Sequence, residues 1–433
     1  MLVLEIAVVL GSIFLGARMG GIGIGYAGGL GVLVLCLFFG LTPGSIPIDV
    51  ILIIMSVIAA IAAMQVAGGL DYMVSIAEKV LRKNPKHITY LAPAVTYFMT
   101  LLAGTGHTAY STLPVIAEVA KEQGIRPSRP LGVAVVASQI AITASPISAA
   151  VVFFSGILEP LGVGYIELLA IVIPTTFAAC MITAFVSNFL GKDLKDDSVY
   201  QERMKKGLVK LRGETKVEIK EGAKLSVAIF CMTIFSVVTY ATLISDKVGI
   251  ITNPTLPRNE AIMVFMLACA TLIVLFTKID SGKIISASTF KSGMSACICV
   301  LGVAWLGTTF VGAHIDEIKG FASTLLSQYP WMLAVTLFFA SMLLYSQGAT
   351  TKALMPAALA LGVDPGTAIA SFAAVSALFV LPTYPTLLAA VEMDDTGSTR
   401  IGKLVFNHPF IVPGVLAIAL SVVFGFIVSG MVL

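Results

Sequence analysis

The amino-acid sequence predicts an all-α protein that crosses a lipid bilayer many times. Of its 433 residues, 58% are hydrophobic and only 12% are charged, and the mean hydropathy is +0.98. A soluble chain of this length would need two or three domains with polar surfaces, and about a quarter of its residues would be charged. The charged residues for such surfaces are missing. The bilayer is therefore the solvent that suits this composition.

Twelve apolar stretches are candidate membrane segments. A helix needs roughly 20 apolar residues to cross the hydrocarbon core, and ten stretches predict such crossings. These ten lie near residues 2–17, 24–40, 50–69, 130–156, 165–190, 224–245, 260–278, 286–312, 366–390 and 409–430. The other two, 88–119 and 331–360, are interrupted at the middle by small polar residues. We expect each to form a re-entrant hairpin that enters and leaves the membrane on one side.

The basic residues predict the orientation of these segments. With ten crossings and two hairpins, 23 of the 27 lysines and arginines fall in loops on one side of the membrane, and three fall on the other. If either hairpin were a full crossing, every later loop would change sides and this bias would collapse. Basic loops stay in the cytoplasm. We therefore expect a multi-pass protein of the bacterial inner membrane with both termini in the periplasm.

A charged cytoplasmic linker, residues 191–223, separates two similar halves, 1–190 and 224–433. The linker mixes both signs of charge and has few aromatic residues, which predicts a solvated connector and no nucleic-acid-binding surface. Each half contains three spans, a hairpin, a span broken at a proline and a last span. Because each half has five crossings, the second must be inverted relative to the first. Inverted repeats with paired broken helices are typical of secondary transporters.

Short motifs support the repeat. A glycine at each hairpin tip is followed eight residues later by a proline. The pairs are Gly106 with Pro114 and Gly348 with Pro356. The next span of each half is broken as well, at residues 143–148 and 381–386.

The four breaks predict one polar site near the middle of the membrane. Irregular backbone at that depth is tolerated only where protein buries it or where it lines a wet cavity. The unpaired N–H groups and the dipole of a helix that starts there favour a carboxylate. The candidate substrate-binding residues are Thr105, Gly106, His107, Thr108, Ser111, Thr143, Ser145, Ser148, Ser346, Gln347, Gly348, Thr350, Thr351, Lys352, Thr383, Tyr384 and Thr386.

This set has hydrogen-bond donors and one cation but no acid, which favours an anionic ligand. Lys352 is the one basic residue outside the predicted loops, and such a charge is a functional candidate; it could instead extend to the outer interface. His107 could bind substrate, carry a proton or hold its hairpin closed. Each hydroxyl alone could simply join helices.

No catalytic or metal-binding motif accompanies this site. The patterns HExxH, GxSxG and DxDxG are absent, and the six cysteines lie in apolar stretches without metal-ligand spacing. Glycines near residue 21 resemble a nucleotide loop, but close helix packing explains them better. A transporter is thus favoured over a membrane enzyme. An anion channel would use the same site, and a sensor could signal through the linker.

Four stretches of the sequence are recognisable: GARMGGIGIGYAGGLGVLVL (16–35), QVAGGLDYMVSIAEKVLRKNPK (65–86), AGTGHTAYSTLPVIAEVAKEQ (103–123) and LPTYPTLLAAVEMDDTGSTRIGKLVFNHPF (381–410). They closely resemble the Dcu family of bacterial C4-dicarboxylate transporters. The short linker is most similar to the constitutive branch that handles aspartate and fumarate. Lys352 is not expected in every relative, so it is a candidate for tuning substrate preference.

The resemblance implies exchange of fumarate, L-aspartate, L-malate and succinate across the inner membrane. External fumarate or aspartate would enter for internal succinate during anaerobic growth. It also implies the ion-transporter superfamily, in which the first three spans of each half form a scaffold and the remaining segments move as an elevator. Such proteins are commonly homodimers. No resident cofactor is implied, and coupling to Na⁺ or H⁺ stays open.

Overall fold

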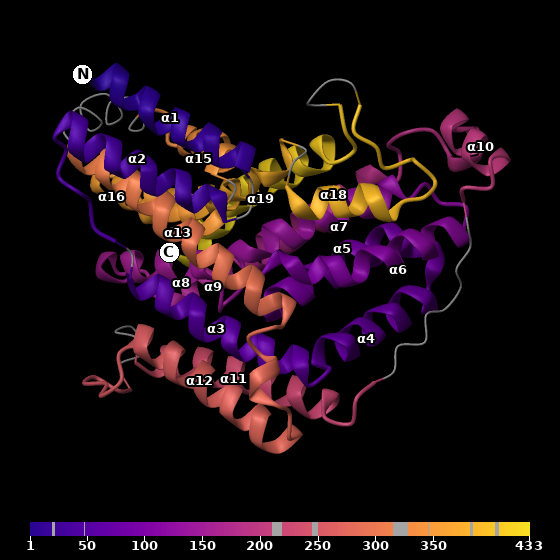
Figure 1. Ribbon diagram of the computed structural model, residues 1–433, viewed down its shortest axis with the longest axis horizontal. Coiled ribbons are helices and arrows are strands. Elements are labelled where there is room, and N and C mark those ends of the chain that lie inside the picture. The colour runs from indigo at the N-terminus through magenta and orange to yellow at the C-terminus, as the bar shows by residue number, and fades with distance from the viewer. Residues whose placement is uncertain are drawn as a thin grey trace.

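The computed structural model describes residues 1–19, 22–46, 48–209, 219–244, 250–314, 328–344, 346–381, 384–402 and 407–433. Among these residues the regular elements are helices, and none lies in a strand (Figure 1). The all-α prediction is confirmed for this part of the chain.

The first half begins with α1 (Leu2–Met19), α2 (Gly23–Phe39), α3 (Ile48–Val66) and α4 (Gly69–Lys83). It continues with α5 (Ile88–Ala103), η2 (Gly106–Thr108), α6 (Ala109–Glu122), α7 (Ser128–Ile140), η3 (Ala141–Thr143), α8 (Ala149–Leu158) and α9 (Tyr165–Ser187). Short turns η1 (Pro85–His87) and η4 (Glu159–Leu161) precede α5 and follow α8.

The linker contains η5 (Leu194–Asp196) and α10 (Ser198–Lys205). The second half contains α11 (Ala223–Leu243), α12 (Arg258–Thr277), η6 (Ser281–Lys283), α13 (Ser288–Ala313), α15 (Met332–Leu344) and α16 (Gln347–Ala360). It ends with α17 (Pro365–Ser371), η7 (Phe372–Phe379), α18 (Pro385–Met393) and α19 (Ile411–Val432).

Five described helices, α9, α11, α12, α13 and α19, are each long and apolar enough to cross a membrane. The predicted span 50–69 bends by 72° where α3 meets α4, and α4 is helical where the sequence predicts a loop. The signal for this amphipathic helix is helical spacing of its apolar residues. Val74, Ala77 and Leu81 are buried and lie three and four residues apart, with charged residues between and beside them. The two predicted hairpins fall on the helix pairs α5–α6 and α15–α16, which pack together within each pair. Ten crossings remain a prediction.

Buried side chains fall into separate clusters. The largest is built mainly from α5–α9 and α15–α19, so segments from both halves share one core. A second cluster joins α3, α11 and α12, and a third joins α2 to α13. Figure 1 shows the same grouping, with α11 and α12 below and α2 beside α13 at the upper left. The broken segments η3 and η7 meet inside the largest group.

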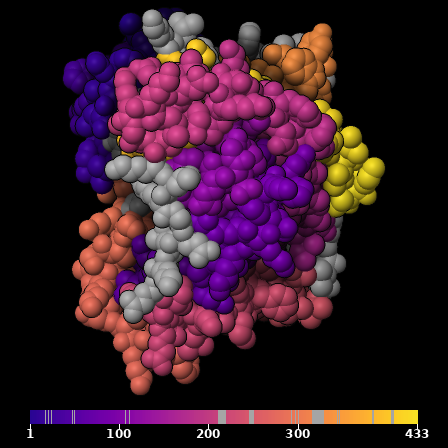
Figure 2. Space-filling view, turned by 90° about the vertical axis from the view of Figure 1, so that its right-hand side faces the viewer, coloured from indigo at the N-terminus to yellow at the C-terminus, as the bar shows by residue number. Residues whose placement is uncertain are grey.

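The first part of the linker is docked onto the protein, contrary to the solvated connector predicted from its composition. Arg126, before α7, forms an ion pair of 2.5 Å with Asp197. Arg203 of α10 donates to the carbonyl of Asp395 at 2.8 Å. Figure 2 shows this segment in magenta against the first half in purple. The mixed charges that suggest solvation are therefore partly used in contacts with distant loops.

Glycines let α2 and α13 approach each other closely. A Cβ on Gly302 would lie 1.9 Å from the Gly25 carbonyl oxygen, and one on Gly28 would lie 2.5 Å from the Gly302 carbonyl carbon. Beyond the end of α2, Trp305 Nε1 donates to the Gly44 carbonyl at 2.9 Å. Small residues at a helix crossing are the usual means of close packing in membranes, which agrees with the packing role predicted for the glycines of this segment.

Gly28→Val should destabilise the α2–α13 contact by about 1–3 kcal/mol, because the added carbons meet backbone that cannot move aside. A Cβ on the neighbouring Gly29 would meet no described atom within 4 Å, so Gly29→Val is the matched control. Thermal unfolding of the detergent-purified proteins measures the difference. Equal unfolding temperatures for the two variants would contradict the proposed contact.

Candidate functional site

Gln139, near the end of α7, joins the broken segments of both halves. Its carbonyl oxygen accepts from Gln347 Nε2 at 3.1 Å and from Ser376 Oγ at 3.2 Å. Its side-chain Nε2 donates to Thr386 Oγ1 at 3.4 Å. The residue is buried, and its Oε1 has no hydrogen-bond partner among the described residues. Gln139 is not among the residues predicted from the sequence; a lone amide within an apolar stretch was the available signal.

The first hairpin tip is packed against the first break. Gly104 has a φ of +66° and ends α5, which glycine permits without strain. Thr108 Oγ1 donates to the Thr105 carbonyl at 3.2 Å and lies 3.1 Å from Thr100 Oγ1. A Cβ on Gly106 would lie 3.2 Å from the carbonyl oxygen of Ser138. The side chains of two predicted residues, His107 and Ser111, lie outside the described part of the structure.

Hydroxyl groups satisfy the backbone at the first break. Thr143 Oγ1 donates to the Ile140 carbonyl at 2.7 Å, and Ser145 Oγ donates to the Leu101 carbonyl at 2.7 Å. Ser148 caps α8 by accepting from the Val151 N–H at 3.2 Å, and it donates to the Ile142 carbonyl at 2.6 Å. These bonds replace the helical bonds that the break removes. The three predicted residues thus have a structural task in this conformation.

The second hairpin tip lies beside the start of α8. Ser346 caps α16 by accepting from the Ala349 N–H at 3.2 Å. A Cβ on Gly348 would lie 3.8 Å from Ala149 Cβ and 4.0 Å from the Ala150 nitrogen. One turn further along, Lys352 Nζ lies 5.9 Å from the centre of the Phe153 ring. Helices α8 and α16 therefore run side by side in the same direction, with their N-termini together.

Converging helix N-termini produce a positive electrostatic potential. The first N–H groups of each helix lack intrahelical partners, and the two dipoles point their positive ends to the same place. Lys352 adds a cation that is 3% exposed, and its Nζ has no hydrogen-bond partner in the described part of the chain. Thr350 and Thr351 instead donate to carbonyls of the preceding turn, at 2.8 and 2.6 Å. This arrangement suits an anion with one or more carboxylates.

The second break extends further back than the sequence predicts. Ser376 and Ala377 have non-helical backbone angles within η7, before the predicted break at 381–386. Ser341 of α15 satisfies the freed groups: its Oγ donates to the Ala374 carbonyl and accepts from the Ala377 N–H, both at 3.1 Å. Tyr384 directly precedes α18, and Thr386 is buried. Thr383 lies outside the described residues.

Comparison with known proteins identifies the family. The family described as anaerobic C4-dicarboxylate membrane transporter matches residues 1–433. The chain belongs to this family. It is 74% identical to a C4-dicarboxylate transporter, DcuA, of Wolinella succinogenes, over the whole of both chains. It is 60% identical to DcuA of Escherichia coli K12, also over the whole of both chains.

Membership of this family makes the protein a multi-pass membrane transporter and not an enzyme. It is also 39% identical to the anaerobic C4-dicarboxylate transporter DcuB of E. coli CFT073, over 99% of this chain and 98% of that one. A solved structure, the YdaH transporter of Alcanivorax borkumensis, shares the fold. The TM-score is 0.57 over 99% of this chain and 97% of that chain, at 13% identity.

Ser341→Ala should lower the free energy of unfolding by about 1–3 kcal/mol, because the buried Ala377 N–H loses its acceptor. The matched control is Ser236→Ala, which removes an exposed hydroxyl that bonds the Met232 carbonyl within its own helix. We expect that change to stay within about 0.5 kcal/mol. Thermal unfolding in detergent compares the two. A Ser341→Ala protein as stable as the control would show that the kink does not need this serine.

Proposed function

We propose that the protein exchanges C4-dicarboxylates, namely fumarate, L-aspartate, L-malate and succinate, across the bacterial inner membrane by alternating access. External fumarate or aspartate would enter in return for internal succinate. The family and the names of the relatives support the substrate class. The structural observation that carries the proposal is the pairing of the α8 and α16 N-termini beside the buried Lys352.

Two separate positive centres suit a substrate with two carboxylates. In our proposal one carboxylate accepts from the N–H groups at the starts of α8 and α16, and the other pairs with Lys352. Lys352 lies five residues beyond Gln347, an axial rise of about 7.5 Å along α16. Lys352 Nζ lies 5.9 Å from the centre of the Phe153 ring, so the second centre is about one helical turn beyond the paired N-termini. L-Aspartate, which also carries an ammonium group, would find an acceptor in Gln139 Oε1.

The separate buried clusters support an elevator. In this proposal the body formed by α5–α9 and α15–α19 carries the substrate, and α1–α3 with α11–α13 form the scaffold. The two halves would be inverted repeats with both termini in the periplasm and residues 191–223 in the cytoplasm. A homodimer through the scaffold is part of the proposal, and no resident cofactor is. The proposal does not assign a coupling ion; the transport experiment below tests Na⁺ and H⁺.

Proteoliposomes loaded with unlabelled succinate should accumulate radiolabelled succinate. Each internal succinate that leaves exposes an empty binding site to the outside, and in an exchanger that site must bind external succinate before it can face inward again. Liposomes without internal dicarboxylate should accumulate much less. Fumarate and aspartate should compete, and citrate should not. Runs with and without Na⁺ and a pH gradient reveal the coupling ion. Equal uptake into loaded and empty liposomes would favour an anion channel and refute exchange.

Lys352→Gln should slow succinate exchange by about tenfold or more, since a charged hydrogen bond contributes about 1.5–3 kcal/mol. Aspartate exchange should fall less. The ammonium group of aspartate makes its net negative charge smaller than that of succinate, so aspartate depends less on the positive charge of Lys352. Lys206→Gln, which removes an exposed linker charge paired with Glu202, is the control and should behave as wild type. Equal losses for succinate and aspartate would mean that Lys352 does not sense substrate charge.

A further inference from the structure

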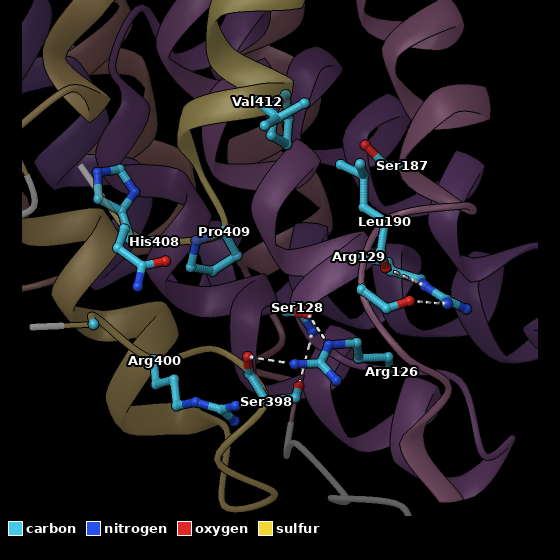
Figure 3. A pocket seen from close by; sticks show the side chains of 14 residues that line it. Arg126, Ser128, Arg129, Ser187, Leu190, Ser398, Arg400, His408, Pro409 and Val412 are labelled. Atoms are coloured by element: carbon cyan, nitrogen blue, oxygen red, sulfur yellow. Dashed lines mark hydrogen bonds between the residues drawn. The ribbon is translucent and has the colours of Figure 1, made fainter. Parts of the chain in front are cut away.

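A polar cavity of about 370 Å³ lies away from the paired helix N-termini. It is lined by the start of α7, the end of α9, the loop after α18 and the start of α19 (Figure 3). Arg126, Arg129 and Arg400 contribute to its lining, together with Ser187 and His408. The linker docks beside it through Asp197. Nothing in the proposed exchange mechanism uses these residues.

The charged side chains that line the cavity are arginines. Asp197 accepts from Arg126 at 2.5 Å and lies 3.5 Å from Arg400, and Asp193 pairs with Arg129 at 3.0 Å. Burial alone would raise the pKa of Asp197, but the hydrogen bonds from Arg126 and the Val199 N–H hold that pKa below its usual value. Asp197 is therefore ionised at neutral pH. Asp197 and Asp193 pair with the three guanidinium groups, and a third carboxylate, Asp394, accepts from Oγ of the lining residue Ser398 at 2.8 Å. The arginines are the charged groups of the lining itself that a ligand would meet.

Two buried polar atoms of the lining have no hydrogen-bond partner among the residues that the structure describes. Ser187 is 1% exposed and His408 is 8% exposed, and the unpaired atoms are Ser187 Oγ and His408 Nδ1. His408 Nε2 donates to the Val380 carbonyl at 3.2 Å, and burial lowers the pKa of this ring, so the neutral Nδ1 is an acceptor and the Ser187 hydroxyl is the unpaired donor of the two. Unpaired buried polar atoms are rare in proteins. An unpaired buried hydroxyl beside three arginines suits an anionic ligand.

One wall of the cavity is apolar and continues onto an exposed apolar surface. Val412, at the start of α19, and Leu190 line it, opposite Arg400 and Arg126 in Figure 3. Nearby Phe185 and Phe189 at the end of α9 are exposed, as is Val412 itself. In a membrane protein, exposed side chains of this kind at helix ends contact lipid chains. The cavity therefore combines a charged pocket with a lipid-facing edge.

We propose that this cavity binds the phosphate group of an anionic phospholipid. The phosphate oxygens would accept from Arg400, Arg129 and the Ser187 hydroxyl, and the acyl chains would lie along the exposed faces of α9 and α19. A basic pocket at the ends of transmembrane helices is suited to such headgroups. Arginine provides the planar donors that match phosphate oxygens. A bound lipid would join α7, α9 and α19 to the loop that carries Arg400.

Native mass spectrometry of the full chain, released from nanodiscs of phosphatidylglycerol and phosphatidylcholine, tests this proposal. Wild type should retain phosphatidylglycerol. Arg400→Gln should retain about fivefold less, which corresponds to about 1 kcal/mol for one basic residue at the membrane surface. Ser187→Ala, a smaller change that keeps the arginines, should reduce retention to a lesser extent. Lys206→Gln removes an exposed charge from the same linker without touching the cavity and should match wild type.

Added inorganic phosphate separates the two sources of the ligand. If phosphatidylglycerol is retained against millimolar inorganic phosphate in wild type and lost in Arg400→Gln, the lipid proposal is supported. If inorganic phosphate displaces the lipid readily and protects wild type but not Arg400→Gln from thermal unfolding, the ligand is soluble and the lipid proposal is wrong. Equal lipid retention in wild type, Arg400→Gln and Ser187→Ala would refute the site altogether.

Discussion

The structure depends on satisfying backbone groups where membrane-embedded helices break. No water is available at that depth to pair the freed N–H and C=O groups, so side chains from other segments must do so. Gln139 does this across α7, α16, η7 and α18. Ser341 does the same for the kink in η7. These bonds tie the two halves of the chain into one body, in which the starts of α8 and α16 lie against each other.

The same constraint separates two kinds of polar residue that look alike in the sequence. Thr143, Ser145 and Ser148 are committed to nearby carbonyls and keep the first break closed. Lys352 Nζ has no hydrogen-bond partner among the described residues, although the side chain is as deeply buried. An unpaired buried cation is costly unless a ligand compensates it. Lys352 is therefore a stronger candidate for substrate contact than any of the hydroxyls at the breaks.

Helices outside this body associate by different means. Helices α2 and α13 contact each other through glycines, so their association rests on close packing of the two backbones. Beside the start of α7, ion pairs of Asp197 with Arg126 and Arg400 hold the linker against loops from both halves. An amphipathic helix, α4, and a docked linker therefore border the body that we propose moves. Any motion of that body has to carry the docked segment with it or break these ion pairs.

Composition and pattern alone determined the solvent, the helical class and the position of the first break in this protein. Each of these is a local property: an apolar stretch, a cluster of basic residues, or a proline eight residues after a glycine. Only the tertiary structure placed Gln139 against Gln347, ran α8 beside α16, and gathered Arg126, Arg129 and Arg400 around one cavity. Their partners lie far away along the chain, and the contacts follow from packing that no local pattern encodes.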